Sequence, residues 1–237
     1  MHVDILPVDD SFTIVKEKRG IHVVKQYLHR WVDWHGERHF QKFRRKHNRT
    51  YIEVAHHQHL VDQMKPLFGL QKIGTHVVYD DKEGYGVMQR WHPVIATVKM
   101  RPYMDQWLSE QTKLELFKIC VFDGVIGGLD RHGNNVIVLK DGSLLTIDDE
   151  DVFYDKLRVW VKFDRDIKRM VYAAAQRQPH YVAAYREHLK KKAALILAVA
   201  DHPVMHANEQ YPFYSILQGN LGRIDEIVDE TLRQMLL

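Results

Sequence analysis

The stretch "LDRHGNNVIVLKDGSLLTIDDED", residues Leu129–Asp151, decides the fold because acids and asparagines bracket two short apolar runs. The pair Asp141–Gly142 separates the runs Val136–Leu139 and Ser143–Ile147. Asp-Gly is among the strongest hairpin signals, because a type I′ turn needs positive φ at both of its central positions. The sequence therefore predicts a β-hairpin with Asp141–Gly142 as a two-residue loop.

The predicted register of this hairpin brings polar side chains together at its open end. With a two-residue loop at Asp141–Gly142, Asn135 lies directly opposite Asp148. Directly opposed residues of an antiparallel pair have Cβ atoms about 4.5–5.5 Å apart. Amide and carboxylate oxygens are hard ligands that suit Mg²⁺, which binds through one or two carboxylates together with substrate phosphates. We therefore expect a Mg²⁺ site at the open end, with Mn²⁺ as an alternative ion.

A second feature is the acid that precedes the hairpin. Asp130 lies five positions before Asn135, and Asp148 follows the second apolar run. A catalytic Asp, an Asn five positions later and a metal-binding Asp after a hairpin form the layout that kinases use for phosphoryl transfer. A hairpin with acidic, solvated ends is the ordinary alternative, and the coincidence of spacing favours the kinase interpretation.

The segment "FDGVIGGLDRHGNNVIVL … LLTIDDED", within residues 122–151, resembles the atypical branch of the protein-kinase-like superfamily. That branch includes HipA-type bacterial Ser/Thr kinases, phosphoinositide lipid kinases, and secretory-pathway and spore-coat kinases. Its members carry Asp-Arg-His, a following Asn, and an Ile/Leu-Asp step after the hairpin. The resemblance implies an α+β, bilobal protein-kinase-like fold that binds ATP and a divalent metal. Residues 1–91 would form an N-terminal lobe with an antiparallel five-stranded sheet and one helix. Residues 92–237 would form a mostly helical C-terminal lobe that carries the hairpin.

The same resemblance implies roles for the residues around the hairpin. Asp130 would be the catalytic Asp that positions or deprotonates the acceptor hydroxyl, and His132 is the alternative base. Asn135 and Asp148 would hold the Mg²⁺ ion that bridges the ATP phosphates. Asp149 would take the metal instead if the register of "IDDED" is shifted by one position.

Two residues of the first lobe resemble the kinase lysine and glutamate that form an ion pair near the phosphates. Lys25, in "HVVKQY", is placed on the third expected strand, just before the connection to the helix, and Lys16 competes with it. Glu53, in "YIEVAHH", resembles the helix glutamate. An ordinary lysine on an alternating strand and a solvent-facing glutamate are the alternative interpretations.

The remaining expected nucleotide contacts lie at the ends of strands. The strand "GVMQRW" would run into a hinge where the backbone near Gln89–Trp91, including Arg90, binds adenine, with Met88 behind it. Core filling explains the methionine equally well. The sequence contains no G-x-G-x-x-G loop, and the turn "PVDDSF" offers Ser11 as a candidate phosphate contact. The two acids of that turn disfavour phosphate, which prefers backbone amides.

Periodicity and turn signals place the other elements. The expected strands span residues 2–8, 11–18, 20–27, 75–79 and 85–91, and a first helix runs from about Ile52 to an end near Pro66 and Gly69. Ser109 is expected to cap a buried helix at residues 110–126. Two further helices are expected at 182–200 and 222–237.

The composition narrows the class of protein. The chain has 237 residues, of which 45% are hydrophobic, and the longest apolar windows are too short for a membrane span. The start "MHVDILPVDD" has no basic and apolar leader, and the single Cys120 excludes a disulfide framework, so we expect a cytoplasmic protein. Sixteen histidines are scattered, and "VAHHQHL" lacks the spacing of a helical metal site.

Several functions remain open from the sequence. A protein Ser/Thr acceptor leads, with a lipid or a small-molecule hydroxyl as alternatives. A kinase-like module that binds a nucleotide or a partner without catalysis is a second class of function, and AMP transfer from ATP is a third. The basic stretch Arg38–Arg49 could dock nucleic acid, an acidic protein or a phospholipid head group, but a solvated basic face is the ordinary interpretation, and a net charge of +3 is too mild to imply nucleic acid.

Overall fold

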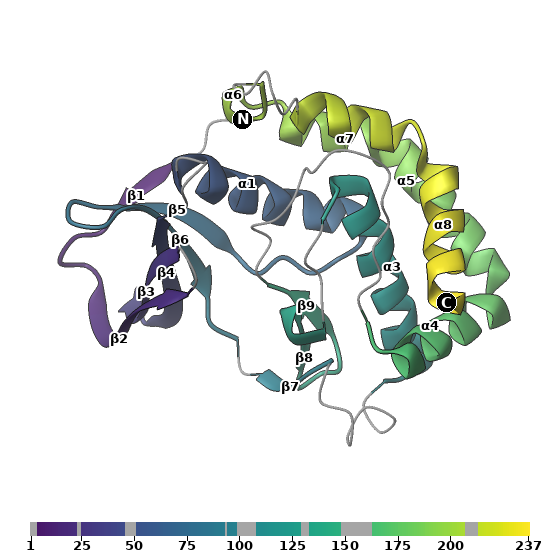
Figure 1. Cartoon of the computed structure of the whole chain (residues 1–237), viewed down its shortest axis with the longest axis horizontal. Helices are drawn as coiled ribbons and strands as arrows, with labels where there is room; N and C mark the ends of the chain where they lie inside the picture. The colour runs from purple at the N-terminus through teal and green to yellow at the C-terminus, as the bar shows by residue number, and fades with distance from the viewer. Residues whose placement is uncertain are drawn as a thin grey trace. The chain divides into compact units, whose positions relative to one another are not determined.

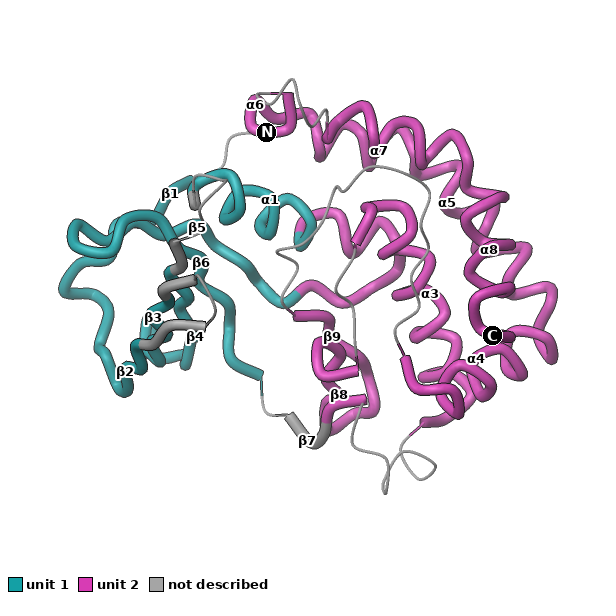
Figure 2. The backbone as a smooth tube through the Cα atoms, in the orientation of Figure 1, with its two compact units in different colours: residues 1–62, 73–92 teal, residues 63–72, 93–237 magenta. Residues whose placement is uncertain are grey.

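The computed structural model describes residues 4–22, 25–45, 51–92, 94–98, 108–128, 133–147, 163–206 and 213–237. The chain forms two compact units (Figure 2). Unit 1 contains residues 1–62 and 73–92, and unit 2 contains residues 63–72 and 93–237. The segment 63–72 therefore belongs to unit 2, although its neighbours in sequence belong to unit 1. The division into lobes at residue 91 stays a prediction.

Unit 1 is built on a six-stranded mixed sheet (Figure 1). Its strands are β1 (Ile5–Pro7), β2 (Thr13–His22), β3 (Lys25–Trp34), β4 (Glu37–Arg45), β5 (Thr75–Asp80) and β6 (Gly84–Arg90). They are ordered β1-β5-β6-β4-β3-β2, and β1 pairs with β5 in parallel while the other neighbours are antiparallel.

The expected five-stranded antiparallel sheet is therefore corrected to six strands with one parallel pair. The expected strand 20–27 is wrong as a single strand, because β2 ends at His22 and β3 begins at Lys25. Residues 28–45, which the sequence left without a strand, form most of β3 and all of β4. The turn at His35–Gly36 was missed because histidine rarely takes positive φ, whereas here His35 has φ 50°.

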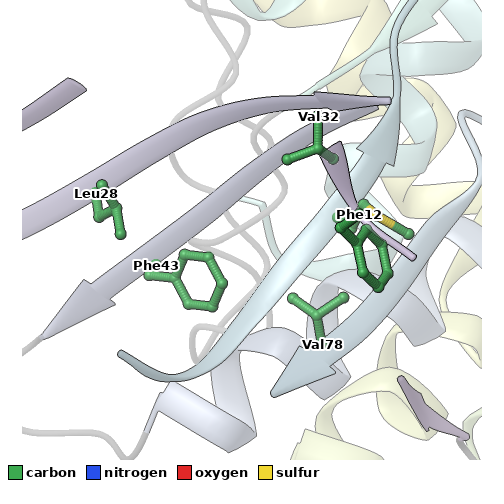
Figure 3. Close-up of a cluster of buried hydrophobic side chains, with 6 residues drawn as sticks. Phe12, Leu28, Val32, Phe43 and Val78 are labelled. Atoms are coloured by element: carbon green, nitrogen blue, oxygen red, sulfur yellow. The ribbon is translucent and has the colours of Figure 1, made fainter. Parts of the chain in front are cut away.

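One face of this sheet carries a hydrophobic cluster (Figure 3). Its buried members are Phe12, Leu28, Val32, Phe43, Val78 and Met88. Phe43 lies opposite Leu28 on one side and opposite Gly86 on the other. A Cβ atom on Gly86 would lie only 2.6 Å from Phe43 Cδ1, so the glycine lets the phenylalanine ring lie flat against β6.

The same face buries an arginine in an ionic network. The Arg30 side chain is 7% exposed; its Nε donates to Glu17 at 2.8 Å and its Nη1 donates to Asp80 at 2.7 Å. The Arg30 hydrogen bond holds the pKa of Glu17 below its ordinary value. Burial alone would raise the pKa of Asp80, but its hydrogen bonds to Arg30 and to two backbone amides lower it overall.

Helix α1 (Tyr51–Met64) follows β4 and continues into the 3₁₀ helix η1 (Lys65–Phe68). Near the end of α1, the fully buried Asp62 accepts the backbone N–H groups of Ile73, Gly74 and Thr75 at 2.8–2.9 Å. One carboxylate thereby fixes the start of β5. Gly69 ends η1 in the left-handed conformation with φ 65°, as the Gly69 signal in the sequence indicated.

Unit 2 combines helices with a small sheet. The helices are α3 (Glu110–Ile126), α4 (Arg165–Arg177), α5 (Pro179–Ala200), α6 (Pro203–His206), α7 (Phe213–Leu221) and α8 (Ile224–Leu236). The sheet contains β7 (Val94–Thr97), β8 (Val136–Leu139) and β9 (Leu144–Thr146) in the order β7-β8-β9. The predicted helix 110–126 and its cap are confirmed, because the Ser109 hydroxyl accepts the Thr112 N–H.

Helix α3 lies at the centre of unit 2. Most of its residues from Leu114 to Ile126 are buried, and it packs against α4, α7 and α8. The buried Asn220 on α7 donates to the Val125 carbonyl at 2.9 Å and ties the end of α3 to that helix. Among the helices in the described ranges, none is both long and apolar enough to cross a membrane.

Candidate functional site

The hairpin β8–β9 has a different register from the predicted one. Val136 pairs with Thr146 and Val138 pairs with Leu144. Leu139 N–H donates to the Ser143 carbonyl, Gly142 N–H donates to the Leu139 carbonyl, and Gly142 has φ 81°. This is a three-residue loop, a type I turn followed by a glycine bulge, and not the predicted two-residue type I′ turn.

The corrected register changes the residue that faces Asn135. The Ile147 N–H donates to the Asn135 carbonyl at 2.9 Å, so Ile147 occupies the position that the prediction gave to Asp148. The predicted direct opposition of Asn135 and Asp148 is therefore wrong. Asp148 and Asp149 lie outside the described residues, so their roles as metal ligands stay predictions.

Asn135 itself is placed firmly. It is the last residue of the 3₁₀ helix η3 (Gly133–Asn135), directly before β8, and its side chain is buried. Upstream, α3 ends at Gly127, which has φ 65°, and the Gly128 N–H donates to the Asp123 carbonyl at 2.7 Å. Asp130 and His132 lie between these two anchored points but outside the described residues, so their catalytic roles also stay predictions.

A buried lysine reaches the open end of the hairpin. Lys65, the first residue of η1, is fully buried, and its Nζ donates to the Thr146 carbonyl at 3.0 Å. Thr146 is the last residue of β9. The sequence analysis did not single out Lys65, because one lysine beside proline and apolar residues has the pattern of an ordinary surface residue.

In unit 1, neither Lys25 nor Lys16, the two lysines considered in the sequence analysis, lies on the strand directly before α1. Lys25 begins β3, where it pairs with His22, and Lys16 lies on the edge strand β2. The strand directly before α1 is β4, and its Lys42 is only 7% exposed. Glu53 is half-buried in the first turn of α1. The expected pair of Lys25 and Glu53 stays a prediction, since the Lys25 side chain is not described.

The side chains at the end of β6 form contacts with other residues of unit 1. Met88 is fully buried in the hydrophobic cluster, where the Gln41 amide lies 3.8 Å from its sulfur. The Gln89 amide donates to the Thr75 hydroxyl at 3.2 Å, and the Arg90 side chain forms an ion pair with Glu37.

Two backbone amides of the expected hinge are also engaged. The Arg90 N–H donates to the Gly74 carbonyl at 3.3 Å, and the Trp91 N–H donates to the Arg38 carbonyl at 2.8 Å. These hydrogen bonds hold residues 90 and 91 in the fold of unit 1. The predicted adenine contacts at this position therefore lack two of their backbone donors.

The turn that carries Ser11 is closed on itself. The Ser11 N–H and hydroxyl both donate to Asp9 Oδ1, at 2.9 and 2.6 Å. These hydrogen bonds lower the pKa of Asp9. The turn connects β1 and β2, which lie at opposite edges of the sheet, so it does not form a hairpin over a phosphate site.

Most of the predicted metal ligands at the hairpin lie outside the described residues, so the Mg²⁺ site stays a prediction. Among the described residues, no group of three or more His, Cys, Asp or Glu side chains could hold a metal ion. The histidines of "VAHHQHL" serve the fold, since His56 and His59 lie within hydrogen-bond distance of the Ile52 and Thr75 carbonyls. The buried amide of Asn135, followed two strands later by an acidic run, offers the oxygen ligands that Mg²⁺ prefers.

Similarity to a solved structure supports the fold. The sequence matches no family model and no curated protein. The structure is similar to the crystal structure of the Helicobacter pylori proinflammatory kinase CtkA, with a TM-score of 0.59 and 11% sequence identity. The similarity covers 98% of this chain and 99% of that kinase. The chain therefore has a kinase-like α+β fold.

Proposed function

We propose that this chain is an ATP-dependent phosphotransferase of the atypical kinase type, which transfers the γ-phosphate of ATP to a hydroxyl group. The observation that carries the proposal is the fold shared with a kinase over nearly the whole of both chains. The spacing of Asp130 and Asn135 and the hairpin that follows them support it independently.

Different residues of the chain have different roles in phosphoryl transfer. Asp130 orients the acceptor hydroxyl and accepts its proton, with His132 as the alternative base. Asn135, together with Asp148 or Asp149, provides oxygen ligands for Mg²⁺ or Mn²⁺. The bound ion would supply neutralisation of the phosphate charge.

The structure suggests a different lysine for the phosphates. The feature sought in the sequence was a lysine on the strand directly before the helix, and that strand is β4. Lys42 is its buried lysine, opposite His29 and Val87 in the sheet. We therefore assign the phosphate contact to Lys42 in place of Lys25. A buried, extended ammonium has the reach and charge for this role.

The test of the function is transfer from γ-labelled ATP in Mg²⁺ buffer to the protein itself and to a generic substrate. Asn135→Ala and Asp148→Ala are expected to lower transfer at least about a hundredfold, as losses of catalytic groups do. Asp141→Ala, at the exposed closed end of the same hairpin, is the matched control and should transfer normally. Full activity of folded Asn135→Ala and Asp148→Ala would contradict the metal assignment.

The acceptor is proposed to be a protein Ser or Thr hydroxyl in the cytoplasm. The single buried Cys120 fits a reducing compartment. Parallel assays with a serine-rich protein, phosphoinositide vesicles and small alcohols separate the acceptor classes. Label that appears only in the vesicles would replace the protein acceptor by a lipid.

A second candidate is a kinase-like module that binds a nucleotide or a partner without transfer. The closed Asp9–Ser11 turn and the engaged amides of Arg90 and Trp91 favour it. A thermal-shift titration with ATP and Mg²⁺, followed by measurement of ATP turnover, distinguishes the two. Stabilisation by ATP without any turnover would select the binding module.

A further inference from the structure

Lys65 is an unusual residue to find at a fully buried position. Its side chain is completely excluded from solvent, whereas lysine is almost never fully buried. Burial of an ammonium group costs several kcal/mol unless hydrogen bonds and compensating charge replace its hydration. Lys65 therefore has a role at this position that an apolar residue of the same length could not fill.

The segment that carries Lys65 is anchored on its other side by α3 and α5. The Tyr185 hydroxyl donates to the Phe68 carbonyl at 3.1 Å, and the His188 ring nitrogen lies 2.9 Å from the Leu67 carbonyl. The Phe68 ring meets the Phe122 ring edge-on, with centroids 4.8 Å apart. The backbone from which Lys65 extends is thus held by the helical core of unit 2.

The anchored segment contacts β9 at both of its ends. Lys65 Nζ donates to the Thr146 carbonyl at the open end, and at the closed end the hydroxyl oxygen of Ser143, directly before β9, lies 3.1 Å from the Gln71 side-chain amide. Strand β9 is an edge strand of the order β7-β8-β9. Because Ile147 N–H faces β8, the Thr146 carbonyl points to the other edge of β9, where none of the described strands pairs with it. Lys65 provides the donor there.

The hydrogen bond from Lys65 is one rung away from Asn135. Thr146 is paired with Val136, and the next pair is the Ile147 N–H with the Asn135 carbonyl. Strand ends fray unless they are fixed by further contacts. A donor that holds Thr146 therefore also limits the motion of Ile147 and, through it, of Asn135.

We propose that Lys65 is a positioning residue that fixes the open end of the β8–β9 hairpin and so sets the position of Asn135. This inference rests on the proposed function, in which Asn135 contributes to the metal site. Lys65 contacts no substrate in this role. It connects the helical core of unit 2 to the strand end from which the acidic segment departs.

The first test needs neither metal nor activity. Amide hydrogen exchange of the metal-free wild-type protein is measured by residue-resolved NMR at Ile147, at the open end, and at Leu139, whose N–H closes the other end. The two amides are expected to exchange at similar rates. Ile147 exchange more than about tenfold faster than Leu139 exchange would show a frayed end and overturn the proposal.

The second test is Lys65→Met, which keeps length but removes the donor and the charge. In the metal-free variant, the Ile147 amide is expected to exchange about tenfold faster, while Leu139 is unchanged, because one charge-assisted hydrogen bond is lost. In the transfer assay, the Mg²⁺ concentration for half-maximal rate is expected to rise about tenfold, as it does when outer-shell partners of metal ligands are removed.

Two matched variants separate positioning from general stability. Lys72→Met removes an exposed lysine that donates to Gln63 in the same segment, and Tyr185→Phe removes the hydrogen bond to Phe68 on the far side. Both are expected to leave the ratio of Ile147 to Leu139 exchange and the Mg²⁺ dependence as in the wild type. A rise in Mg²⁺ requirement in Tyr185→Phe equal to that in Lys65→Met would show that Lys65 acts only through stability.

The outcomes distinguish the two proposals. If the wild type transfers no phosphate, the proposed function fails. The exchange rates of the Ile147 and Leu139 amides still test whether Lys65 fixes the open end of the hairpin. If the wild type transfers phosphate and Lys65→Met changes neither exchange nor Mg²⁺ dependence, the positioning role is wrong and the function stands. Should Lys65→Met not fold, the comparison of Ile147 with Leu139 in the wild type decides.

Discussion

The two hairpins β3–β4 and β8–β9 both turn at a glycine but reach different registers. In β3–β4, Trp34 pairs with Glu37, and the two loop residues His35 and Gly36 have φ 50° and 77°. Two consecutive positive φ values define the type I′ turn. In β8–β9, only Gly142 has positive φ, and the loop has three residues.

The residue before each glycine accounts for the difference. Asp141 keeps negative φ, and its carboxylate accepts the Ser143 N–H at 3.0 Å and the Ser143 hydroxyl at 2.6 Å. His35 takes the left-handed conformation with its ring 4.5 Å from the Trp34 ring. A glycine preceded by a turn-forming residue thus predicts a hairpin well. The number of loop residues depends on local side-chain contacts, and that number sets which residues of the two strands lie opposite each other.

The hairpin bodies also differ in what they bury. Strand β8 is apolar and buried throughout, and so is most of β9. Strands β3 and β4 bury the polar side chains of Arg30, Gln41 and Lys42. The apolar hairpin should tolerate polar changes only at its loop, whereas the polar hairpin should depend on its ionic network. The following substitutions examine this contrast.

The largest effect is expected for Arg30→Met, which removes the cation that Asp80 pairs with and leaves Glu17 paired only with the exposed Arg19. The free energy of unfolding should fall by about 3 kcal/mol at pH 7, as when one partner of a buried pair is removed. Urea denaturation followed by tryptophan fluorescence measures this loss. The control is Arg38→Met, whose exposed ion pair with Asp33 should contribute little measurable stability.

This substitution also carries a pH dependence with a defined sign. The pKa values of Glu17 and Asp80 are lowered in the folded state, so their contribution to stability is present above about pH 4–5, the range of their unfolded values. It is lost as the pH falls through the folded values. The difference between wild type and Arg30→Met should therefore shrink in acid, and a constant difference down to pH 3 would contradict the network.

Gly86→Ala is expected to have the next largest effect. Its Cβ would lie 2.6 and 2.7 Å from two ring carbons of Phe43 and 3.0 Å from the Lys42 carbonyl. Such overpacking should lower the free energy of unfolding by about 2 kcal/mol. The double variant Gly86→Ala/Phe43→Leu, measured in the same denaturation assay, should recover part of the loss. Equal losses in the single and double variants would place the strain elsewhere.

Gly142→Ala tests the bulge of β8–β9. No atom lies within 4 Å of the added Cβ, so only the backbone with φ 81° opposes it, and the expected loss is about 1 kcal/mol. Gly142→Asn should lose less, because asparagine tolerates the left-handed conformation. Thermal unfolding ranks the two variants, and a larger loss for asparagine would argue against the assigned turn.

The smallest effect is a gain. Asn-Gly is the preferred type I′ pair, so His35→Asn should raise the free energy of unfolding by about 0.5 kcal/mol, reduced by the lost contact with Trp34. Asp141→Asn should bring no such gain, because residue 141 does not take positive φ. Equal gains at both positions would erase the difference between the two turns.

Helices α1, α3, α5 and α8 could be predicted from the sequence, whereas α4, α6 and α7 were not expected. Ser109 and Gly69 mark helix boundaries through local chemistry, and the structure confirms both. The hairpin at Gly142 was predicted in the right place with the wrong loop. Strand β4 was missed because the polar and aromatic "ERHFQKFRR" does not alternate, since residues 39–43 are largely buried on both faces of the strand.

Only the part of the candidate site that follows from the spacing of residues in the sequence could be predicted. Asn135 is buried at the predicted hairpin end because η3 and β8 fix it locally. Lys65 and Lys42 could not be found, because their importance depends on burial by segments far away in the sequence. Lys65 meets Thr146 across 81 positions, and such a contact leaves no local pattern.

The assignment of residues 63–72 to unit 2 has a consequence for dividing the chain. A fragment that starts at residue 93 would begin where the second, longer part of unit 2 begins. It would omit η1 and its neighbours, which contact Phe122, Tyr185 and Thr146. Such a fragment would expose apolar helix surface and aggregate more readily than the whole chain. Supplying the segment as a separate peptide should restore a soluble complex, much as a missing strand complements a split protein.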